Sequence, residues 1–313
     1  MARVGETETG NENGQAMATP PTTVVGLADA IGIDVIGLQA LADHPPYNRW
    51  RVPKRSGGWR QIEAPACHLK KAQRWILHHV LPRLRVHEAA HGSVRGRSAV
   101  TFAAEHAAAG TLLRMDIRSF FPSVGIEHVR RALGTVLAPD VARVTALLCC
   151  AGSPRALPQG APTSPSLANA AFLRADQDLE ALACSFGARY TRYVDDLAFS
   201  WRSASDPTEL AGLVRLMLAR HGFEAHPDKT KIMRPHERQE LVGLVLNGDG
   251  PPRPSRSAMR RLRAAVHQAS GAPPSEIRRI QGMIAYVSMS NPARGRKLRR
   301  QLDENLARKA NQV

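Results

Sequence analysis

The stretch "RYVDDLAFS", residues 192–200, places Asp195 and Asp196 side by side within a segment that otherwise reads as a β-strand. Side chains of an extended strand alternate between the two faces of a sheet, so adjacent carboxylates should point apart unless the backbone turns there. A bend at "YVDD" removes this conflict, because both carboxylates can then lie close together at an exposed turn. We therefore predict a β-hairpin over residues 189–201, with the two aspartates at its bend.

Two carboxylates this close repel each other, so a cation must compensate their charge. Mg²⁺ takes oxygen ligands and usually completes its shell with phosphates and water. A third carboxylate, Asp116 in "LLRMDIRSFFPS", comes at the end of another apolar, strand-like stretch. Three such carboxylates would complete a site for two ions roughly 3.5–4 Å apart, which can act on an in-line phosphoryl displacement. The pattern favours nucleotidyl transfer, whereas an isolated Asp-Asp pair is more often a solvated turn.

Hydrophobic periodicity and turn residues predict the remaining elements. Gly57 and Gly58 follow a strand-like stretch and can supply the positive φ that a tight hairpin needs. Residues 1–22 are rich in Gly, Thr, Asn, Glu and Pro without apolar periodicity, which predicts a disordered leader. The predicted helices are two short ones within 24–41, then 68–84, 167–184 and 207–222, and the predicted strands are 48–54, 59–65, 111–117 and 239–247.

The chain is strongly basic, with 43 Lys and Arg against 27 Asp and Glu and a net charge of +16. Such an excess indicates a protein that binds polyanions, with nucleic acid as the leading partner. Residues 251–313 hold 14 of these cations against three acids in a largely helical pattern. A merely solvated helix face usually mixes both signs, so we predict a basic module that contacts phosphates. Its candidate contacts are Arg260, Arg261, Arg263, Arg278, Arg279, Arg296 and Arg299.

Nothing in the sequence predicts export or a membrane. There is no apolar run of about 18 residues, and the first residues lack the apolar core of a secretory signal. The four cysteines form neither CxxC pairs nor a dense framework, so we expect reduced, mostly buried thiols. The expected location is the cytoplasm.

Three segments in chain order, "LLRMDIRSFFPS", "LPQGAPTSPSLAN" and "RYVDDLAFS", resemble the palm motifs of reverse transcriptases, and the wider chain resembles the retron group of these enzymes. The resemblance runs from about Tyr47 to the C-terminal tail. It implies an α+β, right-hand polymerase fold with fingers, a palm built on an antiparallel sheet, and an α-helical thumb. We expect N-terminal helices and fingers over residues 23–110, a palm with an interleaved fingers segment over 111–248, and a basic thumb over 249–313.

The resemblance also implies roles for individual residues. Asp116, Asp195 and Asp196 match the catalytic aspartates, and the implied metal ligands add Ile117 to these three, for two Mg²⁺ ions with Mn²⁺ as a substitute. Phe121 matches an aromatic gate that excludes a ribose 2′-OH, whereas Phe120 is expected in the core. Gly243 matches the strand that supports the primer end. The implied contacts to the incoming dNTP are Lys54, Arg60, Phe121, Gln159, Gly160 and Lys229.

The function implied is RNA-directed DNA synthesis of the retron type. A retron enzyme would copy a dedicated structured noncoding RNA from an internal 2′-OH, yield a branched or RNA-linked DNA, and serve antiphage defence with an effector or toxin protein. Two positions depart from the retron motifs, because Phe102 and Val242 replace the usual Asn and Thr. The alternatives are another bacterial reverse transcriptase (intron-derived, diversity-generating or another defence type) and a non-catalytic RNA-binding scaffold. The length of 313 residues leaves little room for maturase or endonuclease domains, which favours the retron type.

A competing motif is "HEAAH", residues 87–91, which matches HExxH. On a helix this pattern would present two histidines to Zn²⁺ with Glu88 as a base. Gly92 follows at once, and the neighbouring segments fit polymerase fingers. We therefore expect no zinc site here.

Overall fold

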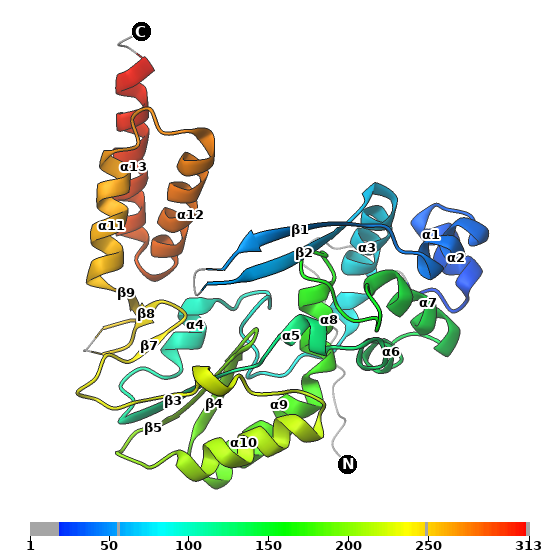
Figure 1. Ribbon diagram of the computed structural model, residues 1–313, viewed down its shortest axis with the longest axis horizontal. Helices are drawn as coiled ribbons and strands as arrows, with labels where there is room; N and C mark the ends of the chain where they lie inside the picture. The colour runs from blue at the N-terminus through cyan, green and yellow to red at the C-terminus, as the bar shows by residue number, and fades with distance from the viewer. Residues whose placement is uncertain (1–18, 55–56, 248–249, 311–313) are drawn as a thin grey trace, which may run out of the picture. The chain divides into compact units, whose positions relative to one another are not determined.

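The computed structural model describes residues 19–54, 57–247 and 250–310 (Figure 1). The chain divides into two compact units that interleave along the sequence. One unit holds the described residues up to Val86 together with Phe121–Phe172, and the other holds His87–Phe120 and the described residues from Leu173 onward. Most of the predicted leader lies outside the described residues, and the division into fingers, palm and thumb stays a prediction.

The first unit is mainly helical and carries one long hairpin. Its helices are α1 (Val24–Ile31), α2 (Val35–Asp43), α3 (Cys67–His79), α6 (Ile126–Leu133), α7 (Pro139–Cys149) and α8 (Ser164–Ala171). The predicted strand pair is confirmed as β1 (Tyr47–Pro53) and β2 (Trp59–Pro65), paired antiparallel. Gly57 and Gly58 have φ of 86° and 77°, which confirms why the turn needs glycine. The turn residues 55 and 56 lie outside the described residues.

A buried glutamine ties this hairpin to the helices of the first unit. Gln73 on α3 donates from Nε2 to the hydroxyl of Tyr47 at 2.7 Å and to the carbonyl of Leu148 on α7 at 2.8 Å. Helix α3 ends at His79, and a 3₁₀ turn over Leu81–Arg83 contains Pro82. The helix predicted over 68–84 is therefore present but ends at His79, because Pro82 cannot continue the hydrogen bonding of an α-helix.

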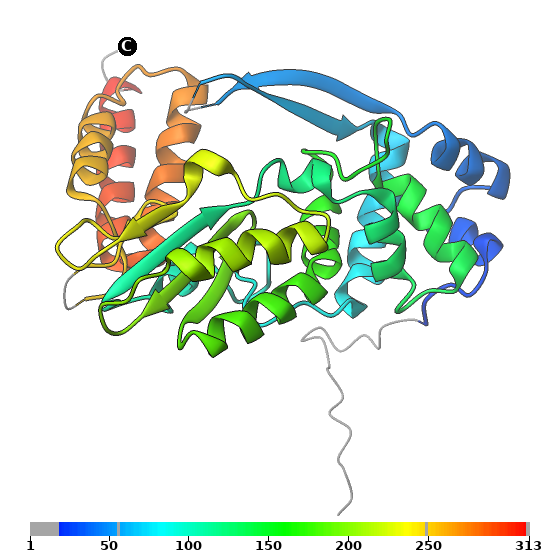
Figure 2. The ribbon, with the colours of Figure 1, turned by 60° about the horizontal axis from the view of Figure 1, so that its bottom comes forward.

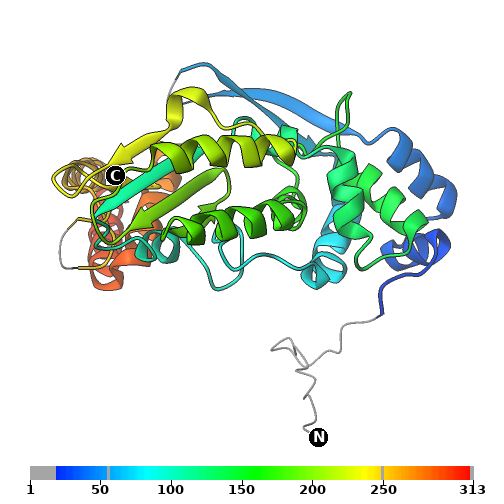
Figure 3. The same ribbon diagram turned by 90° about the horizontal axis from the view of Figure 1, so that it is seen from below.

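The second unit is built on a four-stranded antiparallel sheet in the order β4-β5-β3-β6. The strands are β3 (Thr111–Asp116), β4 (Arg189–Tyr193), β5 (Asp196–Trp201) and β6 (Lys231–Met233). Helices α9 (Leu173–Ser185) and α10 (Thr208–Arg220) lie side by side over one face of the sheet (Figures 1 and 3). Side chains of β3 and β5 point alternately to that face and to the opposite face, where a second core lies. Nearly all of them are buried.

The second core joins the sheet to the elements that follow it. It contains Phe102 and Ala103 from α4 (Ala99–Ala104) and Leu241 and Leu244 from the three-stranded sheet of β7 (Glu240–Leu241), β8 (Leu244–Val245) and β9 (Arg253–Pro254). Tyr193, Val242 and Tyr286 pack against it. We call this group the hairpin cluster.

The predicted helical tail forms a three-helix bundle within the second unit. Helices α11 (Arg256–His267), α12 (Pro274–Ser290) and α13 (Pro292–Ala310) pack side by side, as the orange to red helices in Figure 2 show. Their apolar stripes form one core that includes Leu262, Ile280, Ile284, Leu298 and Leu302. The largely helical pattern predicted for residues 251–313 is therefore confirmed over the three helices.

Two predicted elements are wrong. The single helix over 167–184 is broken at Phe172, a fully buried residue at the end of α8, and no Gly or Pro marks the break. The strand over 239–247 is a tight hairpin, because Val242 and Gly243 adopt φ of 44° and 84° between β7 and β8. Gly is the usual signal for such a turn, but the valine at positive φ is not.

Two further findings concern membranes and thiols. Within the described ranges, no single helix is both long and apolar enough to cross a bilayer, although α1 and α2 together, bent by 96°, meet the length and composition criteria. All four cysteines are free thiols. Cys149 and Cys150 are buried, whereas Cys67 and Cys184 are exposed, so the expectation of mostly buried thiols holds for only half of them.

Candidate active site and nucleic-acid interface

The predicted hairpin at "YVDD" is present. Strands β4 and β5 pair antiparallel, with Tyr193 opposite Asp196, and Val194 and Asp195 form the turn between them. Val194 has a φ of 59°, a left-handed conformation that β-branched residues rarely adopt. The bend that the two adjacent aspartates required is therefore built from a strained valine and the first aspartate.

Asp116 lies beside this bend. The register of β3 on β5 pairs Asp116 with Asp196, and the amide of Ile117 donates to the carbonyl of Asp195 at 2.9 Å. Asp116 is 5% exposed, and Asp195 and Asp196 are half-buried. Three carboxylates from two separate segments of the chain are thus brought to one end of the central strands.

Lys229 reaches the same place from a further segment. A 3₁₀ turn over Pro227–Lys229 follows His226, whose amide donates to the carbonyl of Asp116 at 2.7 Å. The Lys229 ammonium lies 2.9 and 3.0 Å from the two carboxylate oxygens of Asp116. The lysine that we predicted near the nucleotide is therefore an ion-pair partner of a predicted catalytic aspartate.

Arg114 is a site residue that sequence reasoning missed. Its guanidinium holds one carboxylate oxygen of Asp196 through Nε at 2.8 Å and Nη2 at 2.7 Å. Arg114 and Asp116 are two residues apart on β3, so they lie on the same face of the sheet. The two-residue spacing of Arg114 and Asp116 in "RMD" is the sequence signal from which Arg114 could have been predicted as a site residue.

The surroundings of Asp195 and Asp196 disfavour the charged form of both carboxylates. Burial, followed by the neighbouring charges of Asp116 and Asp196, raises the pKa of Asp195 to about 6. Burial also raises the pKa of Asp196, and Arg114 opposes that rise. In the described part of the chain, no group of three or more His, Cys, Asp or Glu is arranged to hold a metal ion as it stands. Asp116 and Asp196 are instead engaged by Lys229 and Arg114.

Most of the predicted dNTP contacts belong to the first unit. Lys54 and Arg60 are exposed and flank the β1–β2 turn, where the amide of Lys54 donates to the carbonyl of Gly58 at 3.0 Å. Gln159 and Gly160 form a loop against β2, because the carbonyl of Gln159 accepts from the amide of Glu63 at 2.7 Å. Gly160 has a φ of 122°, and a Cβ there would lie 3.0 Å from the carbonyl oxygen of Glu63.

The two adjacent phenylalanines have different environments. Phe120 is 3% exposed and packs against Phe223 at 6.2 Å between ring centroids, which confirms its assignment to the core. Phe121 is half-buried in the short helix α5 (Phe120–Ser123). Its predicted role as a gate stays a prediction.

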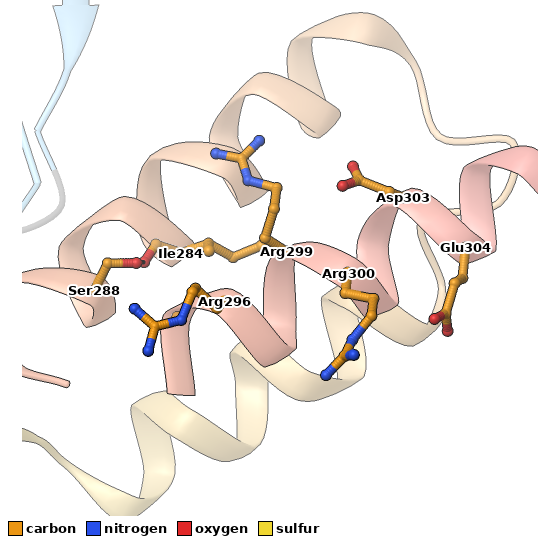
Figure 4. Close-up of a pocket in the computed structure, with 8 residues that line it drawn as sticks. Ile284, Ser288, Arg296, Arg299, Arg300, Asp303 and Glu304 are labelled. Atoms are coloured by element: carbon orange, nitrogen blue, oxygen red, sulfur yellow. Dashed lines mark hydrogen bonds between the residues drawn. The ribbon is translucent and has the colours of Figure 1, made fainter. Parts of the chain in front are cut away.

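The predicted nucleic-acid contacts lie on the bundle and the turn before it. Gly243 stands in the β7–β8 turn, where a Cβ would be 3.7 Å from the hydroxyl of Tyr286. A hollow of about 450 Å³ lies between α12 and α13, lined by Arg296, Arg299 and Arg300 together with Asp303 and Glu304 (Figure 4). The predicted arginines are all exposed, on α11 (Arg260, Arg261, Arg263), α12 (Arg278, Arg279) and α13 (Arg296, Arg299).

The competing zinc motif does not have the required structure. Residues 87–91 form a turn and a single β-bridge rather than a helix. His87 pairs with Glu180 at 3.6 Å, and Nδ1 of His91 lies 2.8 Å from the hydroxyl of Thr101. The two histidines are therefore committed to different partners instead of sharing one helix face.

Known proteins resemble this chain in sequence over most of its length. The family model for reverse transcriptase (RNA-dependent DNA polymerase) matches residues 52–252. The retron Mx162 reverse transcriptase of Myxococcus xanthus is 40% identical, and the match covers 89% of this chain and 66% of that relative. The retron Mx65 reverse transcriptase of the same organism is 36% identical, with 88% and 70% covered.

A solved structure of a foamy viral protease-reverse transcriptase in complex with double-stranded DNA matches with a TM-score of 0.44 at 16% identity, covering 77% of this chain and 35% of that one. The sequence matches are the stronger finding, because the family model spans more than half of the chain and Mx65 exceeds 30% identity with over two thirds of its length covered. They confirm the predicted α+β polymerase fold. The chain belongs to the reverse transcriptase family and, within it, to the retron reverse transcriptases.

Proposed function

We propose that this chain is an RNA-directed DNA polymerase of the retron type. The observation that carries the proposal is the convergence of Asp116, Asp195 and Asp196 at one end of the central strands, with Lys229 bound to Asp116. Nucleotidyl transfer needs carboxylates for cations and a positive group for developing phosphate charge. Membership of the family supports the same chemistry.

The donor set suits two Mg²⁺ ions, with Mn²⁺ as a substitute. Carboxylate oxygens are the ligands that these ions prefer. Burial and then the charges of Asp116 and Asp196 raise the pKa of Asp195, and bound cations would offset both effects. Asp116, Asp195 and Asp196 would hold the ions together with Ile117. When bound, the ions would activate the attacking hydroxyl and neutralise charge on the phosphates. They would compete with Lys229 and Arg114 for carboxylate oxygens.

The chain's own cations have separate tasks in this proposal. A primer hydroxyl attacks the α-phosphorus of a dNTP, a new phosphodiester bond forms, and pyrophosphate leaves with the bond electrons. Lys229, once released from Asp116, would face the developing negative charge on the leaving group or donate a proton to it. Arg114 would keep the carboxylate of Asp196 oriented through its two hydrogen bonds.

The first unit would supply the remaining contacts to the dNTP. Lys54 and Arg60 would hold the triphosphate, and Phe121 would exclude a ribose 2′-OH by its bulk. Gln159 and Gly160 would line the base of the nucleotide site. Gly160 holds this loop close to β2, because its φ is 122° and a Cβ there would lie 3.0 Å from the carbonyl oxygen of Glu63.

The partners follow from the same family. We propose that the exposed arginines of the basic bundle and the turn at Gly243 contact a structured noncoding RNA and its DNA product, with fingers at 23–110, palm at 111–248 and thumb at 249–313. We further propose priming from an internal RNA 2′-OH, a branched or RNA-linked DNA, and antiphage defence with an effector or toxin protein. Because RNA and dNTPs are its substrates, we propose a cytoplasmic location.

The test is dNTP incorporation on an RNA template with Mg²⁺. The double variant Asp195→Ala plus Asp196→Ala should abolish incorporation, whereas Asp178→Asn should not, because Asp178 is an exposed acid of α9 that pairs with His221. If the wild type incorporated no dNTP either, the polymerase assignment would fail and the non-catalytic scaffold would remain. Measurable and equal incorporation by both proteins would show that Asp195 and Asp196 are not the catalytic residues.

The retron type is tested by the nucleic acid that copurifies with the protein. Sequencing should recover one structured RNA joined to DNA at an internal nucleotide. Recovery of intron RNA, or of cDNA copied from a variable repeat, would instead indicate an intron-derived or diversity-generating enzyme.

A further inference from the structure

The bend of the catalytic hairpin is strained. Val194 adopts a φ of 59°, and valine carries two γ-carbons that clash with the backbone in this region. A residue in such a conformation persists only where its surroundings hold it there. Because Asp195 is the next residue, whatever holds Val194 also sets the direction in which the first aspartate of the pair leaves the turn.

Gly92 packs directly beneath this valine. A Cβ on Gly92 would lie 2.6 Å from Cγ2 of Val194 and 2.6 Å from its backbone nitrogen, distances that real Cβ atoms do not reach. Residue 92 therefore has to be glycine for steric reasons, with no positive φ involved. The segment "HEAAHG", residues 87–92, ends at this contact.

The segment before Gly92 is hydrogen-bonded to the hairpin as a short parallel bridge. The amide of Arg192 donates to the carbonyl of Ala89 at 2.7 Å, and the amide of His91 donates to the carbonyl of Arg192 at 2.7 Å. Arg97 fixes this segment in turn, because its Nη1 lies within 3.1 Å of three carbonyls, those of His87, Glu88 and Ala90.

Arg192 also contacts the strained residue. Its side chain is fully buried and forms a two-pronged ion pair with Asp176 on α9, at 2.9 Å from Nε and 2.7 Å from Nη2. The third nitrogen, Nη1, donates to the carbonyl of Val194 at 3.0 Å. Tyr190 adds a hydrogen bond to Asp176 at 2.7 Å, so the carboxylate is itself fixed where it holds the arginine.

We propose that these groups form a positioning device for the catalytic hairpin, which we call the hairpin brace: Ala89–Gly92, Asp176 and Arg192. Gly92 limits where Val194 can go, and Arg192 holds its carbonyl, so that the left-handed turn is kept and Asp195 faces Asp116. Arg192 and Gly92 are positioning residues, because neither would touch the substrate. The kinetic consequence rests on the proposed polymerase function, whereas the structural one does not.

The test compares Gly92→Ala with Gly212→Ala. Gly212 lies in α10 of the same unit, and a Cβ there would meet nothing within 4 Å, so it is a matched control. A misplacement of about 1 Å can cost on the order of 100-fold in rate. We expect Gly92→Ala to lower kcat for dNTP incorporation at least about tenfold, with KM for dNTP within about threefold of wild type.

A second measurement does not need activity. The amide of Ile117 donates to the carbonyl of Asp195, so its hydrogen exchange reports whether the turn keeps its place. We expect faster exchange at Ile117 in Gly92→Ala than in Gly212→Ala. A kcat and an Ile117 exchange rate equal to those of the control would overturn the brace. If the wild type itself incorporates no dNTP, the proposed function fails, and the exchange rates still decide the brace.

A further variant covers the case in which Gly92→Ala does not fold. Val194→Gly removes the strain and the Cγ2 contact, so the fold should keep or raise its Tm while the turn loses its single conformation. We expect kcat to fall although Tm does not. An unchanged kcat in Val194→Gly would show that the held conformation has no part in catalysis and would overturn the proposal.

Discussion

His106 provides a stability prediction whose sign and size follow from its environment. The imidazole is 1% exposed, and its two ring nitrogens lie 2.7 Å from the hydroxyls of Ser200 on β5 and Thr191 on β4. Burial, with smaller contributions from Arg189 and His91, lowers the pKa of His106 to about 3. The neutral ring therefore joins β4 and β5, the two strands of the hairpin that carries Asp195.

The pKa of this histidine is 6.5 in an unfolded chain, so the unfolded state takes up a proton between pH 6.5 and 3 while the folded state does not. Stability must then fall as the pH falls through this window. One pKa unit corresponds to about 1.4 kcal/mol, so His106 alone should lower the free energy of unfolding by roughly 2 kcal/mol between pH 7 and pH 5. Between pH 6.5 and pH 3, His106 should lower the free energy of unfolding by about 5 kcal/mol in total.

The measurement is urea unfolding from pH 7.5 to 5, followed by far-ultraviolet circular dichroism. His106→Gln cannot titrate, so it should be less stable at pH 7, by about 1–3 kcal/mol for disturbed buried hydrogen bonds, but should lose less stability on acidification. His78→Gln is the control, since His78 is exposed on α3. If the wild type and His106→Gln lost stability in parallel over this range, His106 would not be buried as a neutral ring.

Three further predictions concern the site and its supports. Lys229→Gln should lower kcat on the order of 10²-fold, and Lys231→Gln, at an exposed position of β6, should leave it unchanged in the same incorporation assay. Gly160→Ala should lower the free energy of unfolding by about 1–3 kcal/mol because of its φ of 122°, and urea titration against Gly212→Ala measures this. Replacing Arg296, Arg299 and Arg300 by Gln should reduce the slope of log K for RNA against log salt by about 0.7–0.9 for each phosphate that is no longer neutralised. The same change at three exposed arginines outside the basic bundle should leave the slope unchanged; these controls are Arg130 and Arg131 on α6 and Arg143 on α7.

The sequence was sufficient for the features that depend on local pattern. Adjacent aspartates in a strand-like run predicted the bend at Asp195, and helical periodicity predicted the basic bundle. Features that depend on distant contacts could not be predicted. The break at Phe172 has no helix-breaking residue, and the turn at Val242 uses a valine at positive φ, so tertiary packing overrides local preference at both places. Arg114 and Arg192 acquire their roles only when β3, β5 and α9 come together.

The two departures from the retron motifs lie in the same hydrophobic core, the hairpin cluster. Phe102 is fully buried, with its ring 5.7 Å from that of Tyr193 and in edge contact with His106 at 5.9 Å. Val242 packs on the same cluster, and its carbonyl accepts a hydrogen bond from Tyr286 of α12 at 2.5 Å.

Because Tyr193 precedes the strained turn and Tyr286 belongs to the basic bundle, the hairpin cluster connects the proposed catalytic hairpin with the proposed RNA-binding helices. An Asn at position 102 would need polar partners in this apolar cluster, and a Phe does not. Val242 is likewise apolar and packs against the same cluster. Neither substitution touches Asp116, Asp195 or Asp196. We therefore expect the departures to alter how the bundle and the hairpin are coupled, and hence which RNA is accepted, and to leave the chemistry of phosphoryl transfer unchanged.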